Sequence, residues 1–145
     1  MRRALLLRSA QDLLGDDEKV ENAVYMWRRH HLWLAFVVGT AVAVLLIGQL
    51  FDFDTADLAA IAFLLALVAA GSSTRYFVLA RTAESLVLFA GSPIRRVARR
   101  VIRDDLTASQ ISSSGNTMLA TDWSIDGQVY TVPKSCEQDM QAIIG

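Results

Sequence analysis

Two long apolar stretches separated by a short acidic connector dominate the pattern of hydrophobic and polar positions. Residues 32–51 carry no charge, and residues 58–70 form an apolar run that stays uncharged as far as Thr74. A helix rises about 1.5 Å per residue and the hydrocarbon core of a bilayer is about 30 Å thick, so roughly 20 apolar residues span it. The sequence therefore predicts a transmembrane helical hairpin over residues 32–74, with spans of about 32–51 and 55–74.

A pair of buried helices in a soluble protein is the alternative explanation for these two stretches. The first stretch is apolar on all sides rather than along one stripe, so a soluble chain would have to cover it completely. The polar segments that remain in a chain of 145 residues are too few for that. Membrane insertion is the interpretation that the pattern favours.

The distribution of charge predicts the orientation of the hairpin. Six basic residues precede the first span, three aspartates and no base lie in the connector of residues 52–57, and Arg75 and Arg81 follow the second span. Positive residues near the ends of spans stay in the cytoplasm. We therefore expect a multi-pass membrane protein with both termini cytoplasmic, and the net charge of −1 hides this asymmetry.

Residues 1–31 form an N-terminal cytoplasmic segment in which we expect two short amphipathic helices. The first covers residues 1–14 and ends at Gly15, and Asp16 or Asp17 caps the second. The first helix is either an amphipathic anchor on the inner leaflet or a helix packed on the protein's own cytoplasmic domain. The apolar stripes of the two helices are Leu6, Ala10, Leu13 and Leu14 in the first and Val20, Val24 and Trp27 in the second.

Residues 75–145 have the pattern of a small α+β domain. Residues 85–90 are β-branched and aromatic enough for a strand. Residues 117–125 and 128–132 predict a β-hairpin, because the Asp126-Gly127 pair between them supplies the positive φ angles of a two-residue turn. The face expected in the core consists of Leu119, Thr121, Trp123 and Ile125.

Two further signals complete the expected order of elements in this domain. Residues 113–116 read as a turn that precedes the hairpin. Ser135 followed by Gln138 fits a capping box that opens a final helix. The apolar side of that helix carries Met140, Ile143 and Ile144.

A basic segment over residues 92–103 is the best candidate for a binding site. Ser92 can cap a helix and Pro93 suits its first position, and a helical period gathers all the arginines on one face. That face could attract anionic lipid headgroups, bind an acidic patch on a protein partner, or be a solvated surface that only enforces topology. The arginines are Arg95, Arg96, Arg99, Arg100 and Arg103.

A stripe of small residues in the second span is the candidate for helix packing. Ala62, Ala66 and Ala70 repeat every four residues. Small side chains let helices approach closely in lipid, where packing drives their association. The alternative is that alanine is simply common in spans.

The order of segments in the chain resembles a known group of membrane proteins. Residues 76–92, YFVLARTAESLVLFAGS, are followed by the basic segment, a Trp-containing hairpin and a terminal helix, and this succession resembles a small bacterial PH-like domain. Residues 5–24, LLLRSAQDLLGDDEKVENAV, resemble the lead-in of small actinobacterial two-span membrane proteins that carry such domains. The resemblance implies a PH-like fold for residues 75–145 and lends little about activity.

The sequence contains no arrangement that predicts an enzyme. We find no Ser-His-Asp set, no paired metal ligands and no phosphate-binding glycine loop, so no catalytic residue, cofactor or metal is expected. The adjacent His30 and His31 would diverge on a helix and could not share one ligand. Nucleic acid is disfavoured, because no aromatic series accompanies the arginines and Asp104-Asp105 follow them.

The function that this pattern favours is that of a membrane accessory or scaffold protein. Its cytoplasmic domain would bind a membrane-protein partner or anionic lipid. The alternative is a homo-oligomer that forms a small channel or transporter component. Against that alternative, neither uncharged stretch carries the ionisable residue that transport pathways usually use.

The charge asymmetry generates a direct test of topology. Asp54 is expected outside the cell and Cys136, the single cysteine, inside. A membrane-impermeant thiol reagent added to intact cells should label an Asp54→Cys variant at position 54 and spare Cys136. Labelling of Cys136 from outside would overturn the predicted orientation.

Overall fold

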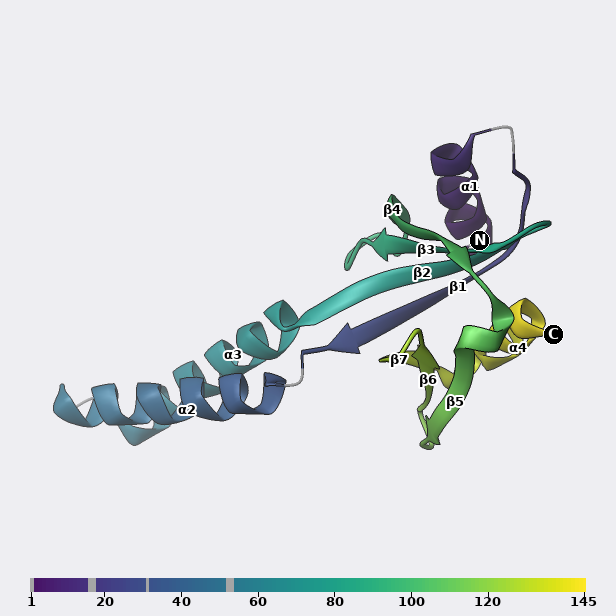
Figure 1. Cartoon of the computed structure of the whole chain (residues 1–145). Helices are drawn as coiled ribbons and strands as arrows, with labels where there is room; N and C mark the ends of the chain where they lie inside the picture. The colour runs from purple at the N-terminus through teal and green to yellow at the C-terminus, as the bar shows by residue number, and fades with distance from the viewer. Residues whose placement is uncertain (1, 16–17, 31, 52–53) are drawn as a thin grey trace. The chain divides into compact units, whose positions relative to one another are not determined.

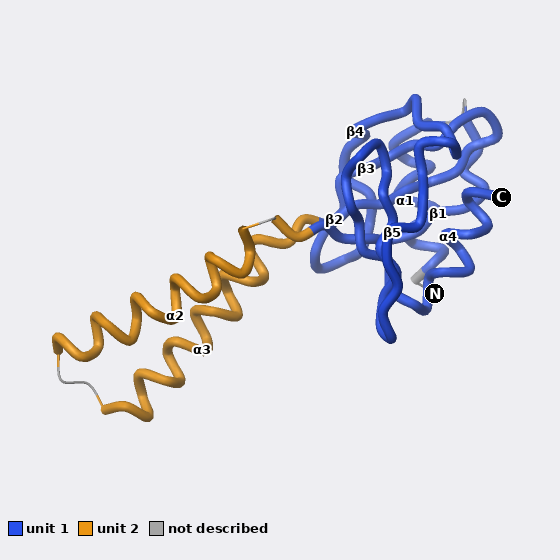
Figure 2. Tube along the Cα trace, turned by 60° about the horizontal axis from the view of Figure 1, so that its bottom comes forward, with its two compact units in different colours: residues 1–28, 76–145 blue, residues 29–75 orange. Residues whose placement is uncertain are grey.

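The chain forms two compact units, a sheet unit of Met1–Arg28 with Tyr76–Gly145 and a hairpin unit of Arg29–Arg75 (Figure 2). The computed structural model describes residues 2–15, 18–30, 32–51 and 54–145. The expected caps Asp16 and Asp17, His31, and the start of the connector at residues 52–53 lie outside the described residues. The N-terminal segment thus belongs to the same unit as the C-terminal half of the chain.

The hairpin unit consists of α2 (Trp33–Leu50) and α3 (Thr55–Ser72), which lie within the two predicted spans. Their mean hydropathies are 2.2 and 1.9, and only 6% and 11% of their residues are buried. A core helix of a soluble protein would be mostly buried, whereas most residues of α2 and α3 are not covered by protein. Both helices are long and apolar enough to cross a membrane. Asp54 caps α3 by accepting a hydrogen bond from the Ala56 amide at 3.2 Å.

The sheet unit contains a seven-stranded sheet whose order is β4-β3-β2-β1-β7-β6-β5 (Figure 1). Each strand pairing with a determined register is antiparallel. The hairpin unit is inserted between β1 and β2, which are neighbours near the centre of the sheet. The strands are β1 (Val20–Arg29), β2 (Thr74–Thr82), β3 (Leu86–Gly91), β4 (Ala98–Leu106), β5 (Ile111–Asn116), β6 (Ala120–Ile125) and β7 (Gln128–Pro133).

The central strands are buried on both faces, so the sheet has two cores. On β2, Phe77 and Leu79 belong to one core, and Val78 and Ala80 to the other. The C-terminal helix α4 (Glu137–Ile144) packs into the first core and the N-terminal helix α1 (Arg2–Leu14) into the second. Buried aliphatic and aromatic side chains on both sides explain why these strands lack a simple alternation of apolar and polar residues.

Helix α1 packs on the protein's own sheet, which decides between the two alternatives for this segment. Leu6 and Ala10 are buried in the second core, together with β1, β2 and β3 side chains. Arg3 forms an ion pair with Asp139 of α4 at 3.1 Å. The helix ends at Gly15 as expected, with a φ of +78° that favours glycine.

The prediction of a second amphipathic helix in the N-terminal segment is wrong. Residues 20–29 form β1, which lies between β2 and β7. Ala23, Val24, Tyr25 and Met26 are all buried, because one core covers each face of the strand. The apolar spacing of Val20, Val24 and Trp27 fitted a helix only because every position in a doubly covered strand tolerates an apolar residue.

The helix expected over residues 92–103 is also wrong. Ser92 does begin one tight turn, since its carbonyl accepts from the Arg96 amide at 3.2 Å, but Arg96 then adopts a φ of +52° that a helix cannot continue. From Ala98 onward the chain is strand β4, paired with β3 through three shifts of register. Long-range pairing with β3 overrides the local helical period.

The β6–β7 hairpin confirms the prediction from the Asp126-Gly127 pair. Both residues have positive φ, 50° and 74°, and Ile125 pairs with Gln128 across a two-residue turn. Thr121, Trp123 and Ile125 are buried as expected. Leu119 is 85% exposed, because β6 begins only at Ala120.

The remaining two local predictions have mixed outcomes. Residues 113–116 are not a turn but the end of β5, with an irregularity between Ser113 and Gly115. The final helix exists, with Met140 and Ile143 buried and Ile144 packed against the core. Its capping box does not form, since a short 3-10 turn at Lys134–Cys136 leads into α4 and no side chain caps it.

The turn at Gly127 yields a test of the hairpin geometry. Gly127→Ala should lower the free energy of unfolding by about 1 kcal/mol, because alanine at positive φ is strained. Gly115→Ala is the matched control: its Cβ would make only ordinary contacts, with Asp122 at 3.5 Å, and it should not destabilise. Urea unfolding followed by tryptophan fluorescence measures both; equal losses in the two variants would contradict the turn assignment.

Candidate functional site

The contact between α2 and α3 is closest at Gly48 and Leu58. Both residues are buried within the hairpin. A Cβ added to Gly48 would lie 2.7 Å from Leu58 Cγ, which is far inside a carbon–carbon contact distance. Leu58 therefore fills the space that the missing side chain of Gly48 leaves.

The alanines that the sequence singles out continue this contact along α3. Ala62 is buried, and Ala66 and Ala70 are half-buried. The bulky side chains of the same helix other than Leu58 are exposed, namely Ile61, Phe63, Leu64, Leu65, Leu67 and Val68. Ala62, Ala66 and Ala70 thus lie with Leu58 on the more buried side of α3.

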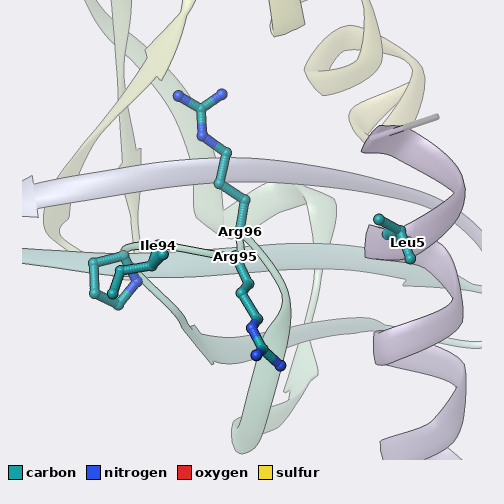
Figure 3. A pocket seen from close by; sticks show the side chains of 5 residues that line it. Leu5, Ile94, Arg95 and Arg96 are labelled. Atoms are coloured by element: carbon teal, nitrogen blue, oxygen red, sulfur yellow. The ribbon is translucent and has the colours of Figure 1, made fainter.

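The five arginines of the basic segment do not share a face. Arg95 and Arg96 lie in the β3–β4 loop, residues 92–97, and their side chains point in opposite directions (Figure 3). Arg99 and Arg100 are exposed on β4. The single basic surface expected from a helical wheel is therefore wrong, because the segment is a loop followed by a strand.

Arg103 is separated from the other four by its partners. It forms ion pairs with Asp126 in the β6–β7 turn and with Asp105 at 3.9 Å. Across the sheet it lies opposite Leu88. Among the described residues, Arg95, Arg99 and Arg100 form no ion pair with a carboxylate. The binding candidates among the five are thus Arg95, Arg96, Arg99 and Arg100.

The β3–β4 loop borders a shallow cavity of about 300 Å³ that it shares with α1 (Figure 3). Its lining consists of Leu5, Pro93, Ile94, Arg95 and Arg96. The side chain of Ile94 is 90% exposed, which is unusual for isoleucine. The loop therefore presents an apolar tip beside two cations.

Aromatic residues hold the base of this loop. The Tyr25 hydroxyl donates to the Ser92 carbonyl at 3.2 Å, and Arg96 lies over the Tyr25 ring at 5.5 Å. Tyr25 stacks on Tyr76 with ring centroids 5.6 Å apart. Burial raises the pKa of Tyr25 to about 12, so its hydroxyl keeps its proton and remains a donor.

A second cavity, of about 360 Å³, lies between β4 and the β6–β7 hairpin. Its apolar lining is Leu88, Ile102, Leu106 and Ile125, and its polar lining is Arg103, Asp126, Gln128 and Tyr130. Arg28 donates to Gln128 and lies over the rings of Tyr130 and Phe77 at 5.8 and 5.9 Å. Burial raises the pKa of Tyr130, an effect that the nearby Arg28 and Arg103 oppose.

Sequence reasoning missed this second cluster. Arg28 counted only as a topology signal, and Tyr130 and Gln128 only as hairpin residues. The lining comes from four strands and a turn, and Arg28, a hundred residues before Gln128 in the chain, contacts it from β1. No local spacing carries such a signal.

Within the described part of the chain, no group of three His, Cys, Asp or Glu side chains could hold a metal ion. Comparisons of the chain with protein-family models, with curated proteins and with solved structures find no match in any of the three.

The Gly48–Leu58 contact can be tested against a matched glycine on the same helix. Gly48→Val should destabilise the hairpin by about 1–3 kcal/mol, because its side chain would overlap Leu58. Gly39→Val is the control, since nothing lies within 4 Å of its Cβ position. Unfolding of the purified protein by a denaturing detergent measures the loss of stability in both variants.

Ala66→Leu, on the half-buried side of α3, should fall between the two glycine variants. The assigned contact is incorrect if Gly39→Val proves as harmful as Gly48→Val.

Proposed function

We propose that this protein is a non-enzymatic membrane accessory protein whose sheet unit lies at the cytoplasmic surface and contacts anionic lipid headgroups through the β3–β4 loop. The observation that carries the proposal is the insertion of two apolar helices between neighbouring strands of the sheet. The chain leaves β1 at Arg29 and enters α2 at Trp33; it leaves α3 at Ser72 and enters β2 at Thr74. Three residues separate β1 from α2 in the sequence, and one separates α3 from β2.

These short connections limit how far the strand ends can lie from the helices. Consecutive Cα atoms are about 3.8 Å apart, so the end of β1 lies within about 15 Å of the start of α2. If α2 and α3 cross a bilayer, the same end of the sheet is held close to the headgroups. Arg29 lies over the Trp33 ring at 4.8 Å, a cation and an indole of the kind that favours the membrane interface.

The β3–β4 loop occurs at this end of the sheet. Phe77, near the start of β2, pairs with Ala90, and Gly91 at the end of β3 packs on the Tyr76 and Phe77 backbone. The loop that follows carries the exposed Ile94 between Pro93 and the arginines. An apolar tip with adjacent cations suits insertion among anionic headgroups, where each basic residue contributes about 1 kcal/mol.

The strand order and the C-terminal helix support the finer description of the sheet unit as PH-like. Four strands follow one another from β1 to β4, three follow from β5 to β7, and α4 closes one core. The positive residues that flank both spans support a bacterial inner membrane with both termini in the cytoplasm. The four arginines could instead bind an acidic surface on a membrane-protein partner. The experiment below distinguishes that partner from anionic lipid.

A fluorophore at position 94 tests the lipid contact in the full-length protein. In liposomes that contain anionic phospholipid, a label on Ile94→Cys, in a Cys136→Ser background, should be protected from aqueous iodide. Protection should fall in liposomes of phosphatidylcholine alone, at high salt, and when Arg95, Arg96, Arg99 and Arg100 are replaced by glutamine, because salt screens exposed charges over about 8 Å at physiological ionic strength.

A label on Leu119→Cys is the matched control. Leu119 is a similarly exposed apolar residue in the β5–β6 turn, at the opposite ends of the strands. It should be quenched equally in all liposomes. Equal quenching at position 94 in anionic and neutral liposomes would rule out the lipid contact, and loss of a co-purifying membrane protein in the arginine variant would then identify a protein partner.

A further inference from the structure

A charge that the protein does not neutralise lies beside the cavity between β4 and the β6–β7 hairpin, where Arg28 contacts two of the lining residues, Gln128 and Tyr130. Arg28 is half-buried at the end of β1, and its hydrogen-bond partner is the neutral amide of Gln128. Its guanidinium lies over the Phe77 and Tyr130 rings, 5.9 and 5.8 Å from their centroids. Within the described chain no carboxylate forms an ion pair with Arg28. A partly desolvated cation of this kind is stabilised when an anion binds beside it.

The lining of the cavity itself supplies another cation, Arg103, and an aliphatic wall. Arg103 reaches the same space from β4 and shares its charge with Asp126 and Asp105. Tyr130, whose ring lies under Arg28, lines the same cavity as Arg103. The aliphatic wall consists of Leu88, Ile102, Leu106 and Ile125.

The size of the cavity limits what could occupy it. A volume of about 360 Å³ is at the lower end of the range for small-molecule sites. One short alkyl chain with a small headgroup fits such a space, whereas a phospholipid with two full chains exceeds it. The combination of an aliphatic wall and an unneutralised guanidinium selects for a molecule that is apolar at one end and anionic at the other.

We infer that this cavity binds a small amphipathic anion, with its carboxylate or phosphate group on Arg28 and Arg103 and its alkyl chain against Leu88, Leu106 and Ile125. The ligand could be a soluble acid or a single-chain lipid anion from the adjacent bilayer, and the recognition chemistry is the same. Binding would add a counter-charge to Arg28 without breaking the Arg103–Asp126 pair. The inference is independent of the lipid contact proposed for the β3–β4 loop, because the two sites share no residue.

Methyl NMR of the full-length protein in phosphatidylcholine nanodiscs tests this site. Titration with octanoate should produce saturable shifts at the Leu88, Leu106 and Ile125 methyl groups. Octanol, which has the same chain without the charge, should bind at least about tenfold more weakly, as should octanoate to Arg28→Gln, since a hydrogen bond to a charged group contributes about that much. Arg8→Gln, at an exposed arginine of α1, should bind octanoate like the wild type.

The same spectra report whether each variant is folded, through the methyl groups of Val24 and Ile143 in the core. Shifts that develop in nanodiscs that contain lysophosphatidic acid, a single-chain lipid anion, and no octanoate identify a membrane source for the ligand; shifts with octanoate alone identify a soluble acid. Absence of saturable shifts, equal binding of octanol, or undiminished binding by a folded Arg28→Gln variant would each overturn the inference. None of these results depends on the outcome at position 94.

Discussion

The backbone pairing of β1 with β2 is the interaction on which the rest of the structure depends. These strands are neighbours near the centre of the sheet, yet the whole hairpin unit separates them in sequence. The two helices act as the turn between them, and His30 donates to the Ser73 carbonyl at 3.1 Å where the hairpin closes. Once β1 and β2 are paired, β3 and β4 extend the sheet on one side and β7, β6 and β5 on the other. Both cores draw side chains from β1 and β2, so neither core forms without this pair.

The parts of the fold that the sequence predicts are those whose signals are local. The uncharged length of the spans and the Asp126-Gly127 turn require no knowledge of distant residues. The parts that it mispredicts depend on pairing partners outside the segment itself. Residues 20–29 are a strand because β2 and β7 flank them, and residues 98–106 are a strand because β3 pairs with them. A helical period in either segment is outweighed by hydrogen bonds to strands that the segment itself does not encode.

The basic segment illustrates how the same residues change meaning with the element that carries them. On a helix the arginines would form one surface; on the edge strand β4 they are distributed along an irregular border of the sheet. Charged side chains and bulges on an edge strand discourage pairing with another sheet. The opposite edge, β5, is serine-rich and also irregular at Ser113 and Gly115. Part of the arginine content of β4 therefore protects the edge, which leaves the β3–β4 loop as the part of the segment with a surface suited to binding.

The position of the hairpin within the sheet also constrains the biosynthesis of the protein. β1 is made before α2 and α3, but both strands that pair with it, β2 and β7, are made after them. β1 must therefore wait for both of its neighbouring strands until the hairpin is complete. Pairing of β1 with β2 then requires both strands on the same side of any membrane that the helices cross. A chain in which only one helix had inserted would hold its two central strands in different compartments, and its sheet could not form. If the helices cross a membrane, only chains with both helices inserted, or neither, can complete the sheet.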